Sequence, residues 1–505
     1  MSDLKGSDRD RITIAILALG GQGGGVLADW IAQLAETQGY VAQGTSVPGV
    51  AQRTGSTVYY VEMVRKAEPG ANRPEPVLAL MPVPGDVDVV LASELMEAGR
   101  SMVRGFVSKD RTTLITSTHR IFAISEKSAL GDGTASSGRI LDAAQARAAR
   151  FVGFDMDAAA TQAGSVISSV MFGALAGSGA LPFPAEAFEA AIRGGGKAVE
   201  ANLKGFAAGY DGATRPVEED EEAKAPLEPT TQAGRRLAAR IAEGLPPAAR
   251  SVALEGVRRL MDYQDAEYAT LYLDRLARVR ALDSGWMNYR LTTTAARRLA
   301  LWMAYEDTVR VADLKLRATR FARIADEVRL GKGQLLHVTE YMHPRLQEVC
   351  ETLPAWLGAP ILRNARLRGW FQPLFARGRH VETTSLRWFL ALRLIASLRP
   401  LRRSTLRYRD EQTRIEAWLK LAREAAATNV PLATEILELQ ELIKGYSDTF
   451  ERGLRNYQSI ADVVRDFMGS SDAAERVRAL RTAALADERG DALRGLLACA
   501  GPAAA

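Results

Sequence analysis

The stretch from Ile12 to Met63 constrains the fold of this chain more than any other part of the sequence. It opens with an apolar run, Ile12 to Leu19, whose length and β-branched content are typical of a buried parallel strand. Five glycines follow around Gln22, and apolar residues then recur at helical spacing from Val26 to Leu34. A strand, a glycine turn and a helix in that order predict a nest of backbone N–H groups at a helix N-terminus. Such a nest suits a phosphate or a carboxylate.

The glycine turn departs from the two common nucleotide-binding fingerprints. Counted from Gly21, Val26 stands where the third glycine of the dinucleotide motif belongs, and no GK[ST] ending follows. Two interpretations therefore stay open for Gly20, Gly21, Gln22, Gly23 and Gly24. They bind an anion or a cofactor phosphate, or they form a tight strand-to-helix turn that only glycine can make.

A second signal comes from the loop-like residues 46–56, which precede a β-rich run from Thr57 to Met63. In this loop Arg53 is followed by Thr54 and Gly55. An arginine there could form paired hydrogen bonds with a phosphate or carboxylate. The alternative is a solvated loop arginine, which the residues alone favour.

These segments together resemble a known family. LGGQGGG, followed by GVAQRTGSTVYYVEM, resembles the γ-type domain of 2-oxoacid:ferredoxin oxidoreductases, and most closely that of indolepyruvate:ferredoxin oxidoreductase β subunits. Gly20 to Gly23 match the GGQG motif of that family. Arg53-Thr54-Gly55 match its RGG-like turn, with Thr54 in place of a glycine, and the run from Ser168 to Leu175 matches a late helix. The resemblance covers residues 10–210.

The resemblance implies a subunit of an enzyme that oxidatively decarboxylates aryl 2-oxoacids to aryl-acetyl-CoA and passes the electrons to ferredoxin. It places thiamine pyrophosphate, Mg²⁺ and [4Fe–4S] clusters on a larger α subunit, with CoA as cosubstrate. This chain would then be inactive without that partner. Gly20, Gly21, Gln22, Gly23, Gly24, Arg53, Thr54 and Gly55 are the candidates for contact with the substrate or with CoA, and no catalytic residue is assigned.

The residues of this chain independently support the placement of these cofactors on another subunit. Cys350 and Cys499 are the two cysteines, whereas a cysteine-ligated cluster needs about four thiolates. The motif Gly131-Asp132-Gly133 begins like a thiamine site, but no asparagine follows before Asn202 to complete its Mg²⁺ ligands. We interpret it as a turn. The four histidines show no metal-binding spacing, so the sequence predicts no metal site in this chain.

Two domains are expected. Alternating strand and helix patterns predict a doubly wound α/β domain with a mostly parallel sheet over residues 10–210. The acidic, proline-rich residues 211–234 predict a linker. Helical patterns then continue through residues 235–490 and predict an all-α domain of unknown role.

The helical half also carries resemblance. MDYQDAEYATLYLDRL and WMAYEDTVRVADLK resemble the helical region of long bacterial indolepyruvate:ferredoxin oxidoreductases. The stretch Lys444–Gly453 resembles a KGYGDTHERG-type segment of the same enzymes, from which Ser447 and Phe450 depart. MDYQD and MAYED also recur within the chain, a weak sign of a repeated helical unit.

Charge and location give weaker constraints. The net charge is +5, and the basic residues of the helical half alternate with acids, which indicates solvated faces rather than a nucleic-acid partner. Trp370, Phe371 and Phe389 lie among arginines. They could bind single-stranded nucleic acid, but the favoured interpretation is helix-core aromatics. Residues 1–11 are polar and charged, and no membrane span is predicted, so we expect a cytoplasmic protein.

The alternative function is a nucleotide-binding α/β protein with a helical interaction domain.

Overall fold

The computed structural model describes residues 10–47, 56–67, 76–122, 126, 130, 134, 136–215, 228–328, 330–331, 333–343, 345–375 and 377–500. The chain forms two compact units, which divide between Glu221 and Glu222. The helices on either side reach into the predicted linker 211–234, because α8 ends at Thr214 and α9 begins at Gln232.

A six-stranded sheet forms the centre of the N-terminal unit. Its order is β2-β3-β1-β4-β5-β6. β1 is parallel to β4, and the parallel pairing continues through β5 to β6. β3 is antiparallel to both β1 and β2, so it alone runs against the other strands. The predicted doubly wound, mostly parallel α/β architecture is therefore confirmed. The strands are β1 (Arg11–Leu19), β2 (Tyr40–Val47), β3 (Ser56–Arg65), β4 (Val89–Ala92), β5 (Thr113–Ser117) and β6 (Arg150–Phe154).

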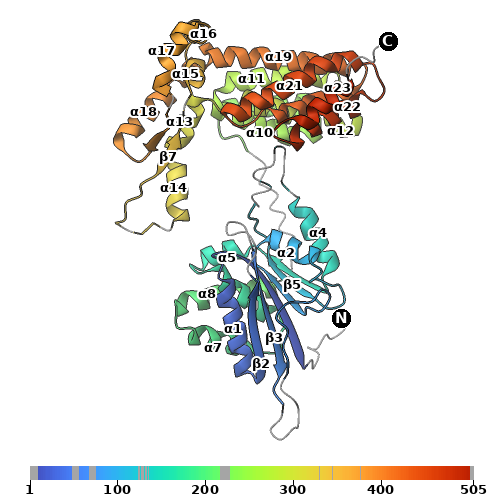
Figure 1. Cartoon of the computed structure of the whole chain (residues 1–505), viewed down its shortest axis with the longest axis vertical. Helices are drawn as coiled ribbons and strands as arrows, with labels where there is room; N and C mark the ends of the chain where they lie inside the picture. Colours follow the sequence, from blue (N-terminus) through green and yellow to red (C-terminus); the bar gives the residue numbers. More distant parts are fainter. Residues whose placement is uncertain are drawn as a thin grey trace. The chain divides into compact units, whose positions relative to one another are not determined.

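Helices cover both faces of this sheet (Figure 1). Side chains of a strand alternate between faces, so Ile14 and Ile16 of β1 pack with α1, α6, α7 and α8, whereas Ala15 and Leu17 pack with α2 and α4. The helices are α1 (Gly24–Thr37), α2 (Leu95–Val103), α4 (Ser137–Arg147), α5 (Met156–Gln162), α6 (Ile167–Ser178), α7 (Ala185–Gly194) and α8 (Val199–Thr214).

Glycines let α6 and α8 approach each other very closely. A Cβ atom added to Gly173 would lie 2.0 Å from the carbonyl oxygen of Phe206, and one added to Gly209 would lie 2.0 Å from that of Val170. No other residue fits at these two positions without moving a helix. Among the described residues no single helix is long and apolar enough to cross a membrane; α5 and α6 reach that criterion only as a pair, bent by 113°.

The C-terminal unit is helical, as predicted, with one addition: β7 (Thr339–Met342) and β8 (Arg379–Glu382) form a two-stranded antiparallel ribbon. Its main core includes the indoles of Trp302 and Trp418, which pack with their planes tilted by 57° and their ring centroids 5.1 Å apart. The helices that build this core are α9 (Gln232–Gly244), α10 (Pro247–Tyr263), α11 (Ala266–Arg280), α12 (Trp286–Met303), α19 (Leu406–Ala426), α20 (Val430–Glu438), α21 (Ser447–Phe467), α22 (Ala473–Ala486) and α23 (Asp491–Ala500).

A smaller lobe lies between α12 and α19 in the sequence and contains the ribbon (Figure 1). Its apolar core is small, with Ala312, Val381 and Leu392 as its buried members. The expectation that the aromatic residues here form a helix core is wrong for Trp370, which is 83% exposed, because so little core exists to cover it. The helices of this lobe are α13 (Thr308–Leu316), α14 (Ala318–Glu327), α15 (Leu346–Thr352), α16 (Ala355–Arg363), α17 (Ala365–Phe371) and α18 (Leu386–Ser397).

Candidate functional site

The glycine loop lies at the carboxyl edge of the sheet, between the end of β1 and the start of α1. Gly21 and Gly23 have φ angles of 88° and 74°, in the left-handed region that glycine adopts freely. A Cβ atom on Gly23 would lie 2.7 Å from Ser168 Oγ, and one on Gly24 would lie 2.5 Å from the ring of Tyr59. Gly20 and Gly21, in contrast, face open space. The second half of the loop is therefore a tight turn, and its first half leaves room for a ligand.

The loop also borders the topological switch point of the sheet. β1 and β4 are adjacent and parallel, but α1 packs on one face of the sheet and α2 on the other. The loops that follow these two strands consequently diverge, and ligands of open α/β sheets bind in such crevices. The first N–H groups of α1 have no acceptor within the helix, and its N-cap Gly23 offers no side chain to cap them. Their partial positive charge favours an anion.

Gln22 connects the two loops that flank this crevice. Its Oε1 accepts a hydrogen bond from the backbone N–H of Leu19 at 3.1 Å, and the Ser93 hydroxyl, just after β4, donates to the same oxygen. The oxygen of Gln22 is thus occupied within the protein. We interpret Gln22 as a residue that positions the glycine loop against the end of β4.

Glu94 follows Ser93 and is 1% exposed. As the N-cap of α2, its carboxylate accepts hydrogen bonds from the backbone N–H groups of Met96 at 2.9 Å and Glu97 at 2.7 Å. Burial raises the pKa of Glu94, and these N–H groups oppose that effect. Glu94 is not among the residues predicted from the sequence, although a charged residue two positions after the wholly apolar strand β4 was an available signal.

The end of β5 adds a third polar group at the same edge of the sheet. Ser117 Oγ lies 2.6 Å from His119 Nδ1 and accepts the backbone N–H of Met156 at 2.9 Å. Within the described part of the chain, the buried His119 Nε2 has no hydrogen-bond partner. Ser117 therefore fixes the ring of His119 through one nitrogen and leaves the other available.

Of the residues predicted from the sequence, Gly20, Gly21, Gln22, Gly23 and Gly24 meet at this edge. Arg53, Thr54 and Gly55 lie outside the described residues, as does the turn 131–133. β3 begins at Ser56, directly opposite Leu19, so this strand starts beside the glycine loop. In the described ranges, no group of three or more His, Cys, Asp or Glu residues could hold a metal ion.

The amino edge of the sheet carries a different kind of polar cluster. Arg111 Nε donates to Asp88 at 2.8 Å, and Arg11 binds Asp86 at 2.7 Å and also Glu62. Burial acts to raise the pKa of Asp88, but hydrogen bonds from Arg111 and Thr13 lower it overall. These charges are paired with one another, so we assign this cluster to stability rather than to binding.

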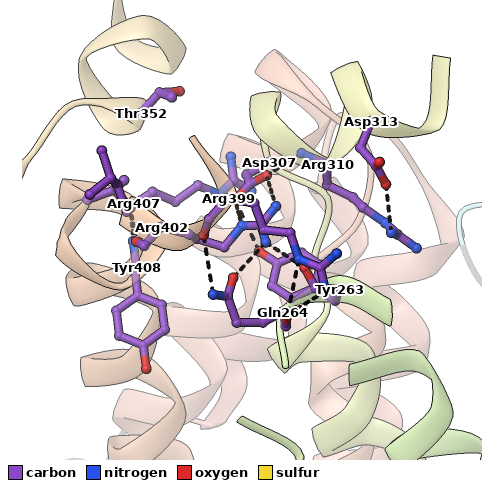
Figure 2. Close-up of polar contacts among 12 residues, drawn as sticks. Tyr263, Gln264, Asp307, Arg310, Asp313, Thr352, Arg399, Arg402, Arg407 and Tyr408 are labelled. Carbon is purple, nitrogen blue, oxygen red and sulfur yellow. Dashed lines mark hydrogen bonds and ion pairs between the residues drawn. The ribbon is translucent and has the colours of Figure 1, made fainter. Parts of the chain in front are cut away.

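A second buried polar network lies in the C-terminal unit, and Figure 2 shows its residues. Arg402 is 2% exposed and donates to Asp307 at 2.6 Å, to the Tyr263 carbonyl at 2.6 Å and to Gln264 Oε1 at 2.8 Å. Its guanidinium also lies 4.1 Å from the centroid of the Tyr263 ring. A buried charge with this many partners is satisfied within the protein, so Arg402 itself is not a candidate for binding a ligand.

This network also explains the repeated pentapeptides. Asp265 ends the first and caps α11 through the N–H of Tyr268, and Asp307 ends the second and caps α13 through the N–H of Arg310. The two motifs are therefore breaks between consecutive helices, each closed by an N-cap aspartate. The adjacent residues Arg402 and Arg403 each bind one of these aspartates.

Comparisons with known proteins give a family for each unit. Residues 13–212 match the model of the family "Pyruvate ferredoxin/flavodoxin oxidoreductase", and residues 249–463 match a family of unknown function, DUF6537. A search of curated proteins gave no match.

Solved structures of oxidoreductase subunits also match the chain. The pyruvate oxidoreductase subunit PORC of Thermotoga maritima is 18% identical, and the match covers 40% of this chain and 97% of that one, with a TM-score of 0.27. The γ subunit of a keto/oxoacid ferredoxin oxidoreductase from Geobacter sulfurreducens is 17% identical, with coverage of 41% and 97% and a TM-score of 0.27. The 2-oxoglutarate:ferredoxin oxidoreductase of Magnetococcus marinus, solved with 2-oxoglutarate, coenzyme A and succinyl-CoA, is 14% identical, with coverage of 42% and 33% and a TM-score of 0.29.

The family match spans the sheet, the glycine loop and the helices of the N-terminal unit. The N-terminal unit thus carries a domain that matches the pyruvate ferredoxin/flavodoxin oxidoreductase family.

Proposed function

We propose that this chain is the β-type subunit of an arylpyruvate, or indolepyruvate, ferredoxin oxidoreductase. In that reaction an aryl 2-oxoacid, CoA and two oxidised ferredoxins give an aryl-acetyl-CoA, CO₂, two reduced ferredoxins and a proton. Thiamine pyrophosphate, Mg²⁺ and [4Fe–4S] clusters would reside on a larger α subunit, where thiamine pyrophosphate supplies the decarboxylation chemistry. The family domain over residues 13–212 is the observation that carries the proposal.

The geometry of the glycine loop supports a binding role for this subunit. Gly20 and Gly21 border open space beside the N-terminus of α1, at the carboxyl edge of the sheet. A phosphate of CoA or the carboxylate of a 2-oxoacid fits the partial positive charge there. Gln22 and Ser93 would hold the loop in place while the ligand binds. This part of the chain would bind and orient, without making or breaking bonds.

The helical unit supports the choice of an aryl substrate through its resemblance to long indolepyruvate enzymes. Two of its resembling segments contact each other: the Tyr305 hydroxyl donates to the Gly445 carbonyl, and the Tyr446 hydroxyl donates to Glu306. Ser447, which replaces a glycine of the resembling segment, has a φ of 50°, a conformation that glycine adopts freely. The two segments therefore contact each other in the fold, and Ser447 keeps a backbone conformation that favours the glycine of the resembling segment.

The test is to tag this chain in its native cells and purify its complex without oxygen. CoA-dependent reduction of ferredoxin is then measured with indolepyruvate, phenylpyruvate, 2-oxoglutarate and pyruvate. We expect a brown complex with a larger subunit that contains iron and acid-labile sulfide, and the highest kcat/KM with an aryl substrate. The chain expressed alone should be colourless and inactive.

The possible outcomes separate the parts of this proposal. A preference for 2-oxoglutarate or pyruvate would overturn the aryl assignment and leave the class of enzyme intact. A brown chain with stoichiometric acid-labile sulfide when expressed alone would contradict the division of cofactors. No CoA-dependent oxidation of any 2-oxoacid by the complex would overturn the proposed function altogether.

A further inference from the structure

The smaller lobe of the C-terminal unit contains a cavity of about 1200 Å³, which the proposed function leaves unused. Residues of α13, α14, the β7–β8 ribbon and α18 line it. Pockets for small molecules commonly measure roughly 300–1000 Å³, so this cavity can accept a large organic ligand. Every lining residue belongs to the C-terminal unit, so the cavity belongs to that unit alone.

One part of the lining is apolar. Trp388, Leu392 and Ile395 of α18 contribute successive turns of one helix face, and Val311 and Val381 come from α13 and β8. Leu392 and Val381 belong to the small core of the lobe, whereas Trp388 and Ile395 are only partly buried against it. An apolar ligand would complete the burial of these side chains, which the hydrophobic effect favours.

The rest of the lining is rich in charged side chains. Seven lysines and arginines line the cavity, against four acidic residues. Asp307 is paired at 2.6 Å with Arg402, which lies outside the lining, whereas Glu306 and Glu348 accept hydrogen bonds from the Tyr446 and Ser447 hydroxyls of the lining and keep their charge. Three of the cations are likewise paired with acids outside the lining: Arg317 with Asp262 and Asp313, Arg323 with Glu327, and Arg407 with Glu351 and Glu411.

The fourth acid does not neutralise its surroundings. Glu340 is shared by two cations, Lys315 and Arg320, and its side chain is only 18% exposed. One carboxylate between two cations leaves a local excess of positive charge at Lys315 and Arg320.

Two further arginines are available for an anion. Among the described residues, neither Arg377 nor Arg379 has a carboxylate partner; the side chain of Arg379 donates to the Leu374 carbonyl at 3.4 Å. The planar guanidinium of arginine suits the paired oxygens of a carboxylate or phosphate. Both side chains line the same cavity as the apolar face of α18.

We propose that this cavity binds an amphipathic organic anion. Its carboxylate or phosphate head binds Arg377 and Arg379, and its apolar chain or ring system packs against Trp388, Leu392 and Ile395. A simple inorganic anion would leave the apolar face unused, and a hydrocarbon would leave the cations unpaired. The inference rests on this cavity alone and does not depend on the proposed function of the N-terminal domain.

The first experiment tests the cavity itself, by titration calorimetry of the full chain with decanoate, decyl phosphate and 1-decanol below their micelle concentrations. Decanoate and decyl phosphate should each bind saturably with one site per chain. Ala391→Trp fills the cavity from α18 and should abolish binding. Leu394→Trp is the matched control, since Leu394 is on the same helix, is 69% exposed and does not line the cavity.

The second experiment tests the head group. The double variant Arg377→Ala/Arg379→Ala should weaken binding of both anions by at least tenfold and leave 1-decanol unchanged. Arg366→Ala/Arg368→Ala is its control, because these exposed arginines of α17 lie outside the cavity. The tighter of the two anions then identifies the head group. Circular dichroism establishes that each variant folds, and Ile395→Trp replaces Ala391→Trp if the latter does not.

Four outcomes would overturn the proposal. The first is that neither anion binds saturably. The second is that both anions bind equally well to the wild type and to the folded Ala391→Trp variant. The third is that removal of Arg377 and Arg379 weakens the binding of 1-decanol as much as the binding of the anions. The fourth is that the chain binds an oligothymidylate, that decanoate does not displace it, and that decanoate itself does not bind saturably. That result would assign these arginines to nucleic acid instead of an amphipathic anion.

Discussion

The glycines of the loop after β1 have different surroundings. A substitution at one position is therefore expected to affect ligand binding, and a substitution at another to affect stability. Gly20 is exposed, and an added Cβ atom would meet nothing within 4 Å, whereas one on Gly23 would lie 2.7 Å from Ser168 Oγ. Gly23 also has a left-handed φ of 74°. A side chain at position 20 would therefore occupy the space proposed for the ligand, and one at position 23 would press against α6.

We predict that Gly20→Val lowers kcat/KM of the assembled complex by roughly tenfold or more, the effect of losing one charge-assisted hydrogen bond of about 1.5–3 kcal/mol. Its melting temperature should stay near that of the wild type. Gly23→Ala should instead lower the free energy of unfolding by about 1–3 kcal/mol, through overpacking and the left-handed backbone. Equal loss of stability in both variants would contradict the assignment of open space to Gly20.

Arg53 stays a prediction from the sequence, since it lies outside the described residues. Arg53→Ala should raise the apparent KM for the 2-oxoacid or for CoA by roughly tenfold to a hundredfold, with partner binding unchanged. Arg104→Ala is a control, because Arg104 is an exposed arginine at the end of α2. Steady-state kinetics and size-exclusion chromatography of the complex measure both effects. Dissociation of the larger subunit with normal KM values would show that Arg53 is an interface residue.

Glu411 makes the stability of the C-terminal unit depend on pH. It is 6% exposed, and burial raises its pKa to about 7, although Arg407 donates to it at 3.0 Å. A carboxyl with a raised pKa keeps its proton longer in the folded state. The stability that it contributes is complete below its ordinary pKa of 4.5 and is lost as the pH rises through about 7.

We therefore predict that the wild type loses about 3 kcal/mol of unfolding free energy between pH 4.5 and pH 8 relative to Glu411→Gln, whose side chain does not titrate. Urea unfolding followed by tryptophan fluorescence measures this difference, and most tryptophans of the chain lie after residue 285. Parallel pH profiles for the two proteins would show that the carboxyl titrates normally.

At the scale of elements, the crossing of α6 and α8 depends on glycine. Gly173→Ala would place its Cβ 2.0 Å from the Phe206 carbonyl oxygen and force the helices apart. We expect a loss of at least about 1–3 kcal/mol of stability. Gly138→Ala, near the exposed start of α4, should be neutral or slightly stabilising. Thermal unfolding of both variants compares them, and an unchanged Gly173→Ala protein would mean that these helices can separate without cost.

The sequence predicts some elements well and others poorly, for physical reasons. The apolar, β-branched run of β1 and the glycine turn after it are local signals, and both are found where expected. The edge strands β2 and β6 were not identified, because each has only one neighbouring strand and alternates little between apolar and polar residues.

The same distinction applies to the candidate site. The glycine positions follow from the local sequence, but the bridge from Gln22 to Ser93 joins residues 71 positions apart. Likewise the partnership of Ser117 with Met156 depends on the order of strands in the sheet. Contacts of this kind come from topology, which a single sequence does not specify.

At the scale of the whole molecule, the two units have separate cores, so the chain should tolerate cleavage between them. We predict that a glutamate-specific protease first cuts at Glu218, Glu219, Glu221 or Glu222. Each fragment should then keep its own cooperative thermal transition. Mass spectrometry of the first products tests this, and initial cleavage inside either unit would contradict the predicted linker.

The network around Arg402 has a consequence for synthesis of the chain on the ribosome. Tyr263 and Gln264 precede Arg402 by 139 and 138 positions. At about 5–20 residues per second, the ribosome reaches this arginine roughly 7–28 s after it has completed α10. Asp265, which caps α11, is made at the start of that interval, and Asp307, which caps α13, is made part-way through it. Until Arg402 and Arg403 are synthesised, we expect both carboxylates to be solvated by water. We therefore expect the first helices of the C-terminal unit to complete their packing only after its later segments are synthesised. A chaperone that binds partly folded helical intermediates would have this interval in which to bind the unit.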